Sequence, residues 1–159
     1  MQLNTPIQIQ TIMPEVIGVT FPIPKLYIPR FFDEGKTVFI KPATIFKELQ
    51  PGMKFVFYQS KKDTGYVGEG KIKTITFAED PFYFFEIYPN DIYLSKGDLD
   101  IYIEANKKWK TKRTRRKGET KSRRWIAIEL ESIRRYDTPI KPKHFIPISG
   151  KYIKSCPDD

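Results

Sequence analysis

Basic side chains able to bind phosphate are concentrated in one stretch of this 159-residue sequence. Residues 107–124 read KKWKTKRTRRKGETKSRR and contain eleven Lys and Arg but one acid, Glu119, for a net charge of +10. The rest of the chain, with seventeen Lys and Arg against eighteen Asp and Glu, has a net charge of −1. Because each Lys or Arg that contacts a phosphate releases a counterion, such a tract is typical of nucleic-acid binding. The sequence therefore predicts a polyanionic partner held by one segment, with no basic surface elsewhere.

We expect this basic segment to form a mobile loop or the tip of a long hairpin. Like charges repel at this density, the segment lacks apolar periodicity, and it contains Gly118. The alternative is a solvated insertion that binds nothing specific. In the functional interpretation Trp109 stacks on a base while the cations contact phosphates. The residues assigned to this phosphate-binding arm are Lys107, Lys108, Trp109, Lys110, Lys112, Arg113, Arg115, Arg116, Lys117, Lys121, Arg123 and Arg124.

The single cysteine, Cys156, and the single histidine, His144, exclude several kinds of chemistry. One cysteine allows no disulfide within the chain and no Cys-x-x-Cys pair, and the two residues together cannot build a Cys/His zinc site. We interpret His144 as a surface or cleft histidine and Cys156 as a bystander thiol. No cofactor and no metal are expected.

Two glycine patterns resemble phosphate-binding motifs without meeting their requirements. Gly35-Lys36-Thr37 lacks the glycine that a P-loop needs five residues earlier, where this chain has Arg30. Gly65, Gly68 and Gly70 lie within a predicted strand, so they indicate a bulge or a close approach by a backbone or a ligand.

The elements that position these residues are short. Strands are predicted at 16–21, 36–41, 53–60, 65–76, 125–130 and 144–148, and helical segments at 26–34, 44–50, 82–87 and 95–106. Ser95 and Asp98 form a capping box that begins the last helix. This pattern predicts an α+β fold, a small mixed β-barrel with a few short helices and a long basic loop or hairpin. We expect residues 1–15 to be an extension and residues 16–159 to be one domain with a basic insertion at 107–124.

The N-terminus has no basic segment followed by an apolar one, and no apolar run reaches the roughly 18 residues of a membrane span. We therefore expect a soluble cytoplasmic protein without a membrane partner.

Three consecutive segments, GKTVFIKP (35–42), PGMKFVFYQS (51–60) and GYVGEG (65–70), resemble the PUA-like superfamily and are closest to its ASCH and EVE branches. Their order is a helix ending in Gly-Lys, a strand, a Pro-Gly turn before a tyrosine-bearing strand, and a glycine-bearing strand. The chain from Val16 onward also resembles an uncharacterised archaeal family of about this length, on the stretches 39–44 and 57–60.

The resemblance implies a pseudobarrel whose cleft binds RNA or a modified nucleoside. Carried over by position, it assigns five residues to the RNA or nucleotide cleft: Lys36, Lys41, Tyr58, Ser60 and Tyr66. This chain departs from the ASCH pattern at Lys41, where arginine is usual, at Phe39, where some ASCH hydrolases have threonine, and at Met53, where an acid often follows Pro-Gly.

Three hypotheses of function follow. The first is an RNA-binding domain that holds a nucleotide, modified or not, in the cleft while the arm contacts the backbone of tRNA or rRNA, with RNA preferred to DNA. The second is an ASCH-like RNA nuclease or nucleoside amidohydrolase, in which Lys36 or Lys41 stabilises an oxyanion and Glu129 or Glu69 activates water. The third is a protein-interaction module of an RNA-processing assembly. Glu129 and Glu131 are also considered as an acid and base pair on one strand.

Overall fold

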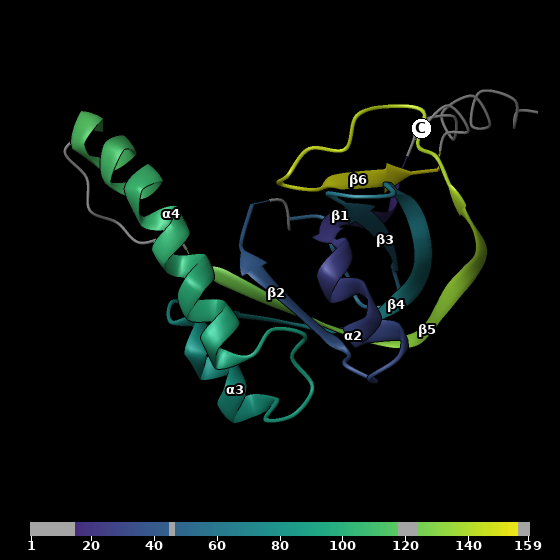
Figure 1. Cartoon of the computed structure of the whole chain (residues 1–159), viewed down its shortest axis with the longest axis horizontal. Helices are drawn as coiled ribbons and strands as arrows, with labels where there is room; N and C mark the ends of the chain where they lie inside the picture. Colours follow the sequence, from purple (N-terminus) through teal and green to yellow (C-terminus); the bar gives the residue numbers. More distant parts are fainter. Residues whose placement is uncertain (1–14, 45–46, 118–123, 156–159) are drawn as a thin grey trace, which may run out of the picture.

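The structure, a computed structural model, describes residues 15–44, 47–117 and 124–155. A mixed six-stranded sheet with the order β2-β5-β4-β3-β1-β6 curves into a half-barrel (Figure 1). Its strands are β1 (Val16–Pro24), β2 (Val38–Pro42), β3 (Lys54–Ser60), β4 (Gly65–Ala78), β5 (Trp125–Ile140) and β6 (Lys151–Lys154). The α+β barrel predicted from the sequence is confirmed.

One strand pair is parallel, that of β1 with β3, and the remaining neighbours in the sheet are antiparallel. The long strands β4 and β5 form the curved wall of the half-barrel, with β2 on one side and β3, β1 and β6 on the other (Figure 1). The helical elements are η1 (Lys25–Tyr27), α2 (Ile28–Phe32), η2 (Pro81–Tyr83), α3 (Phe84–Ile87) and α4 (Lys96–Lys117).

The interior of the half-barrel is aromatic. Phe21 of β1, Phe39 of β2 and Phe55 and Phe57 of β3 are buried, and Phe31 of α2 packs on the same cluster. Their ring centroids lie 4.9–5.7 Å apart. Edge-to-face and offset stacking at such distances adds to the free energy gained by burial alone. The sheet and α2 are therefore joined by one continuous aromatic core.

The expectation of a loop or hairpin for the basic segment is wrong over residues 107–117, which continue α4 to Lys117. The helix begins with the predicted capping box, in which the Asp98 amide donates to Ser95 Oγ and the Ser95 amide donates to the Asp98 carboxylate, both at 3.0 Å. Lys and Arg are good helix formers, and cations near a helix C-terminus are stabilised by its dipole. These preferences outweigh the repulsion between like charges. Residues 118–123 lie outside the described residues.

Several element boundaries differ from the prediction. Strand β5 runs to Ile140 instead of ending at 130, and the last strand is β6 at 151–154 instead of 144–148. In the segment 144–148 Ile146 is buried, but Phe145 and Ile148 are more than 80% exposed, so the segment lacks the alternating buried face of a strand. Residues 47 and 48 form a turn where a helix was expected.

Within these described ranges, no helix is long and apolar enough to cross a membrane.

Candidate functional site

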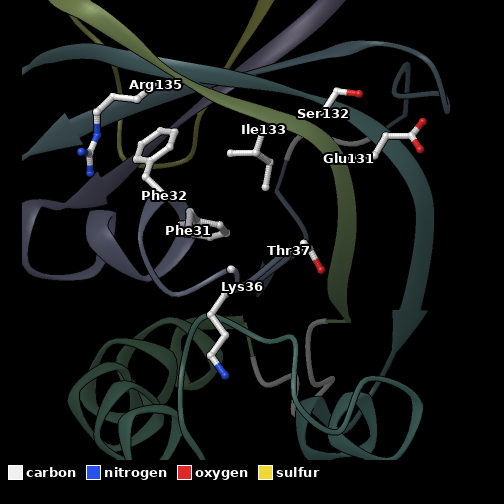
Figure 2. Close-up of a pocket in the computed structure, with 9 residues that line it drawn as sticks. Phe31, Phe32, Lys36, Thr37, Glu131, Ser132, Ile133 and Arg135 are labelled. Atoms are coloured by element: carbon white, nitrogen blue, oxygen red, sulfur yellow. The ribbon is translucent and has the colours of Figure 1, made fainter.

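A pocket of about 320 Å³ lies between the end of α2 and the middle of β5. Figure 2 shows Phe31, Phe32 and Ile133 in its interior and charged and hydroxyl side chains around its edge. Pockets that bind small molecules typically begin at roughly 300 Å³ and combine apolar walls with a few polar groups. The lining residues are Phe31, Phe32, Gly35, Lys36, Thr37, Glu131, Ser132, Ile133 and Arg135.

The turn after α2 brings Lys36 and Thr37 to the edge of the pocket. Pro29 occupies the first turn of this short helix, where a missing N–H has no cost, and its carbonyl accepts from the Asp33 amide at 2.7 Å. Gly35 then adopts a φ of +76°, the left-handed conformation that commonly ends helices. The chain reverses there and enters β2 directly after Thr37.

A bulge in β5 forms the opposite wall. The pairing register with β4 shifts between Glu69 and Lys71, and Ser132 has a φ of +55°. This irregularity places Ile133 against Gly70, where an added Cβ would lie 3.2 Å from the Ile133 side chain. The bulge predicted in the glycine-bearing strand is found elsewhere, at Val67, the extra β4 residue between the pairs Tyr66–Tyr58 and Gly68–Phe57.

Gly68 has the same role for the neighbouring wall residue. A Cβ at this position would lie 2.4 Å from the ring of Phe32 and 2.6 Å from the Arg134 carbonyl oxygen. The glycines at 68 and 70 thus let two pocket side chains approach β4 closely. The close approach predicted from the glycine spacing is made by an aromatic ring of the same chain.

The floor of the pocket is rigid because its aromatic residues also belong to the core. Phe31 stacks on Tyr93 with a centroid distance of 5.0 Å and meets Phe57 edge-on at 4.9 Å. Phe32 lies 5.0 Å from Phe57. A ligand ring would therefore contact side chains whose rotamers are already fixed by packing.

Two cations stand at the edge of the pocket. The Arg135 guanidinium lies 5.0 Å from the Phe32 ring centroid, and its Nη2 donates to Asp33 Oδ2 at 3.2 Å. Lys36 Nζ donates to the Asn90 carbonyl oxygen at 2.8 Å, and no carboxylate of the described residues is in ion-pairing distance of it. Figure 2 shows the Lys36 side chain directed away from the aromatic floor.

The acceptor groups at the edge are Glu131, Ser132 and the hydroxyl of Thr37. Within residues 15–44, 47–117 and 124–155, no side-chain hydrogen bond or ion pair engages these three. They are available to a ligand that offers amino, imino or hydroxyl donors.

The structure distributes the five predicted cleft residues over three places. Lys36 lines the pocket described above. Lys41 Nζ lies 4.8 Å from the Phe21 ring centroid and donates to the Ile148 carbonyl oxygen at 3.1 Å. Tyr58 and Tyr66 form an edge-to-face pair at 5.8 Å near the β3–β4 turn, and Ser60 ends β3 beside that turn.

The tyrosine pair is half-buried. Burial, together with the neighbouring Tyr58, raises the pKa of the Tyr66 hydroxyl. The adjacent turn carries an ion pair between Lys25 and Asp63, and Lys141 Nζ donates to the Thr64 carbonyl oxygen at 2.7 Å. This surface, which we call the tyrosine surface (Tyr58, Ser60 and Tyr66), has aromatic faces bordered by lysines.

The other carboxylates considered for catalysis already have partners. Glu129 accepts from the Thr74 hydroxyl at 2.9 Å and lies 3.9 Å from Lys73. Glu69 accepts from the Tyr136 hydroxyl at 2.8 Å, and burial together with this hydrogen bond raises the Tyr136 pKa. Of the two residues considered as an acid and base pair, only Glu131 lines the pocket.

His144 is exposed, and Cys156, Lys121 and Arg123 lie outside the described residues. Arg124 is stacked over the Phe77 ring at 4.5 Å. The other arm residues, 107–117, belong to α4, which extends away from the half-barrel in Figure 1. The described residues contain no group of three His, Cys, Asp or Glu side chains that could hold a metal.

Sequence reasoning missed five pocket residues: Phe31, Phe32, Ser132, Ile133 and Arg135. The adjacent phenylalanines in a segment expected to be amphipathic were a usable signal. No such signal marked Ile133 and Arg135, because the second half of β5 is largely exposed and its buried and exposed residues do not alternate regularly.

Comparison with known proteins supports the resemblance. Residues 16–155 match the model of a family described as a domain of unknown function, DUF365. An uncharacterized protein of Methanocaldococcus jannaschii is 41% identical over 103 residues, which cover 64% of this chain and 90% of the relative.

Solved structures show the same fold. The crystal structure of the ASCH protein of Zymomonas mobilis superposes with a TM-score of 0.66, covering 87% of this chain and 89% of that protein at 12% identity. The crystal structure of a mutant of the same Zymomonas protein gives a TM-score of 0.68, covering 90% of this chain and 92% of the mutant, also at 12% identity. The half-barrel is therefore an ASCH-type, PUA-like fold.

Proposed function

We propose that this chain, which belongs to the DUF365 family, is a nucleic-acid-binding domain that holds one unstacked nucleotide of an RNA in the pocket between α2 and β5. The basic segment 107–124 contacts the phosphate backbone beside it. This proposal rests on one observation, the contrast between two parts of the chain. A rigid aromatic pocket lies on a nearly neutral body, and almost all excess positive charge lies in one separate segment.

The pocket supports base binding by its composition. Aromatic and aliphatic walls suit the face of a planar ring, and the acceptors Thr37, Ser132 and Glu131 suit its polar edge. Sequence-selective RNA recognition generally uses single-stranded bases that are unstacked and placed against aromatic side chains. The two hydroxyl groups also suit the 2′-hydroxyl by which RNA differs from DNA.

The tyrosine surface is the proposed contact for a neighbouring nucleotide. Stacking on an aromatic ring contributes about 1–3 kcal/mol per base and tolerates any sequence. Lys41, at the end of β2, is proposed as a further phosphate contact, reached by exchange of its hydrogen bond to the Ile148 carbonyl oxygen. Selectivity then resides in the pocket, and most of the affinity resides in the charged segment.

Binding of fluorescein-labelled single-stranded RNA, tRNA and duplex DNA, followed by anisotropy at several salt concentrations, tests the proposal. A variant with four arm lysines changed to glutamine keeps the helix-forming tendency of the segment and removes its charge. A matched control removes the same charge from four exposed lysines elsewhere. The arm variant changes Lys107, Lys108, Lys110 and Lys112, and the control changes Lys47, Lys71, Lys143 and Lys154.

The arm variant is expected to lower RNA affinity at least about tenfold at low salt and to reduce the slope of log K against log salt by up to about 3. The control is expected to change affinity far less. Equal losses in both variants would show that only total charge matters and would contradict an arm. Absence of RNA binding by the wild type at low salt would overturn the proposed function.

A second candidate function, hydrolysis of an N-acylated nucleoside, is favoured by one specific observation. Lys36, Thr37 and the carboxylate of Glu131 line the same pocket, so a water held there would have a base near it, and a turn of the Lys36 side chain away from the Asn90 carbonyl oxygen would bring a donor to the acyl oxygen. Incubation with acylated nucleosides and mass spectrometry of the products tests this function. Release of the acyl group that is lost in both Glu131→Gln and Lys36→Ala would establish it, and no turnover would leave binding alone.

A further inference from the structure

We propose that Arg135 binds the phosphate of the nucleotide in the pocket, by exchanging its present partner Asp33 for the ligand, so that the pocket prefers nucleoside monophosphates to free nucleosides. This inference rests on the proposed function and names the ligand class more closely. It is carried by the contacts of Arg135 at the edge of the pocket.

The pair between Arg135 and Asp33 is easily exchanged. Their side chains are 50% and 56% exposed, and one contact of 3.2 Å joins them. Exposed ion pairs of this kind contribute little stability because water screens them and two side chains must be held still. Within the described residues this is the one hydrogen bond that the guanidinium donates, so most of its five N–H groups remain for another acceptor.

A second contact, with an aromatic ring, orients the guanidinium. It lies over the ring of Phe32, which is held between Phe57 and the backbone at Gly68. Figure 2 shows Arg135 and Phe32 together at one edge of the pocket, with Phe31 and Ile133 beside them. A planar guanidinium held in this way loses little further freedom when a phosphate binds, and its forked donors match two phosphate oxygens.

Under this proposal the Asp33 carboxylate occupies the place beside Arg135 that the phosphate of the ligand would take. This carboxylate occupies the donor that a phosphate would use and keeps Arg135 compensated when the pocket is empty of ligand. Lys36, which also lines the pocket and has no carboxylate partner among the described residues, adds positive potential. Removal of the Asp33 charge should therefore raise phosphate affinity, an effect opposite in sign to that of removing Arg135.

The experiment measures binding of the four common nucleosides and of their 5′- and 3′-monophosphates to the full chain by calorimetry and by NMR of the Thr37 and Ile133 methyl groups. In the wild type, at least one monophosphate is expected to bind about tenfold or more tightly than its nucleoside. Arg135→Gln should remove that preference and leave nucleoside affinity nearly unchanged. Asp33→Asn should raise monophosphate affinity severalfold without changing nucleoside affinity.

Arg134→Gln is the matched control. Arg134 is the neighbouring residue on β5 and has the same charge, but it lies 3.6 Å from the Glu69 carboxylate and does not line the pocket. This variant should keep the monophosphate preference. Thermal unfolding of each variant checks that the fold is intact.

The outcomes separate this inference from the proposed function. Nucleosides and monophosphates that bind equally, or a preference that persists in Arg135→Gln, would overturn the role of Arg135 and leave the base pocket standing. A preference that is lost equally in Arg134→Gln would show a general charge effect and would also overturn it. If no nucleoside or monophosphate shifts the Thr37 and Ile133 signals, the pocket part of the proposed function fails, and the inference fails with it.

Discussion

The half-barrel and the second half of α4, residues 107–117, differ in composition and charge. The half-barrel is built around buried aromatic rings, and two of the pocket residues, Phe31 and Phe32, pack on that core. Residues 107–117 contain eight Lys and Arg and no acid, and they continue the helix that begins at the capping box. Under the proposed function this division would separate selectivity from affinity, because base contacts specify and phosphate contacts position.

The strongest test of this comparison removes a core ring. Phe57→Ala should lower the free energy of unfolding by about 3–5 kcal/mol, because Phe57 is fully buried and contacts Phe31, Phe32 and Phe55. Ile101→Ala on α4 is the control, and it should change stability by less than about 0.5 kcal/mol because Ile101 is 70% exposed. Urea denaturation measures both. Similar losses would mean that α4 is as integral to the core as β3.

Glycine-to-alanine substitutions in the two regions are expected to have smaller effects on stability, and these effects should be opposite in sign. Gly68→Ala should destabilise the fold by about 1–3 kcal/mol, since the new Cβ would overlap Phe32 and the Arg134 carbonyl oxygen. Gly97→Ala, in the first turn of α4, should stabilise it by up to about 1 kcal/mol because only Ser95 Oγ lies near, at 3.7 Å. Melting temperatures and urea midpoints report both signs. Stabilisation by Gly68→Ala would refute the tight packing assigned to the pocket wall.

The smallest expected effect lies where the two regions meet. Asp98 at the start of α4 accepts from Arg30 Nη1 of α2 at 2.6 Å and from the Ser95 amide. Burial opposes its ionisation, but these hydrogen bonds and the charge of Arg30 outweigh burial and hold the pKa of the carboxyl below its usual value. Asp98→Asn should therefore lower the free energy of unfolding by about 1–2 kcal/mol at pH 7.

The pH dependence identifies the charge as the cause. Because the folded pKa of Asp98 is lowered, its contribution is complete above the unfolded pKa of about 3.9 and is lost as the pH falls through the lower folded value. The difference between wild type and Asp98→Asn should thus narrow below about pH 4. Asp100→Asn, on an exposed position of the same helix, is the control for removal of a carboxylate from this helix. A constant difference across pH would assign the effect to packing.

The sequence predicted those features that depend on local rules. The capping box at Ser95 and Asp98 and the close approach at Gly68 and Gly70 are both confirmed, because each follows from the geometry of a few consecutive residues. The ASCH-type fold was predicted from the resemblance of three neighbouring segments to the PUA-like superfamily. Its candidate cleft residues remain predictions.

The pocket itself was harder to predict from the sequence, because it forms only when segments far apart in the chain pair with one another. Arg135 belongs to a part of β5 that is exposed and lacks alternation, so only its partner β4 defines it as a strand. The parallel pairing of β1 with β3 likewise cannot be derived from either strand alone. For the arm, charge repulsion was given too much weight against helix propensity and capping.

The neighbours of β1 have a consequence for how the chain reaches its fold. This strand lies between β3 and β6, and the Glu15 amide and Ser155 Oγ, 140 residues apart in sequence, are hydrogen-bonded at 3.0 Å. During synthesis β1 therefore cannot pair with β6 until nearly all of residues 16–155 have left the ribosome. Contacts of such long sequence separation slow folding and prolong the exposure of an unpaired strand edge. The short strand β6, which begins and ends with lysine, is the last strand of the sheet to be synthesised. Its pairing covers the free edge of β1.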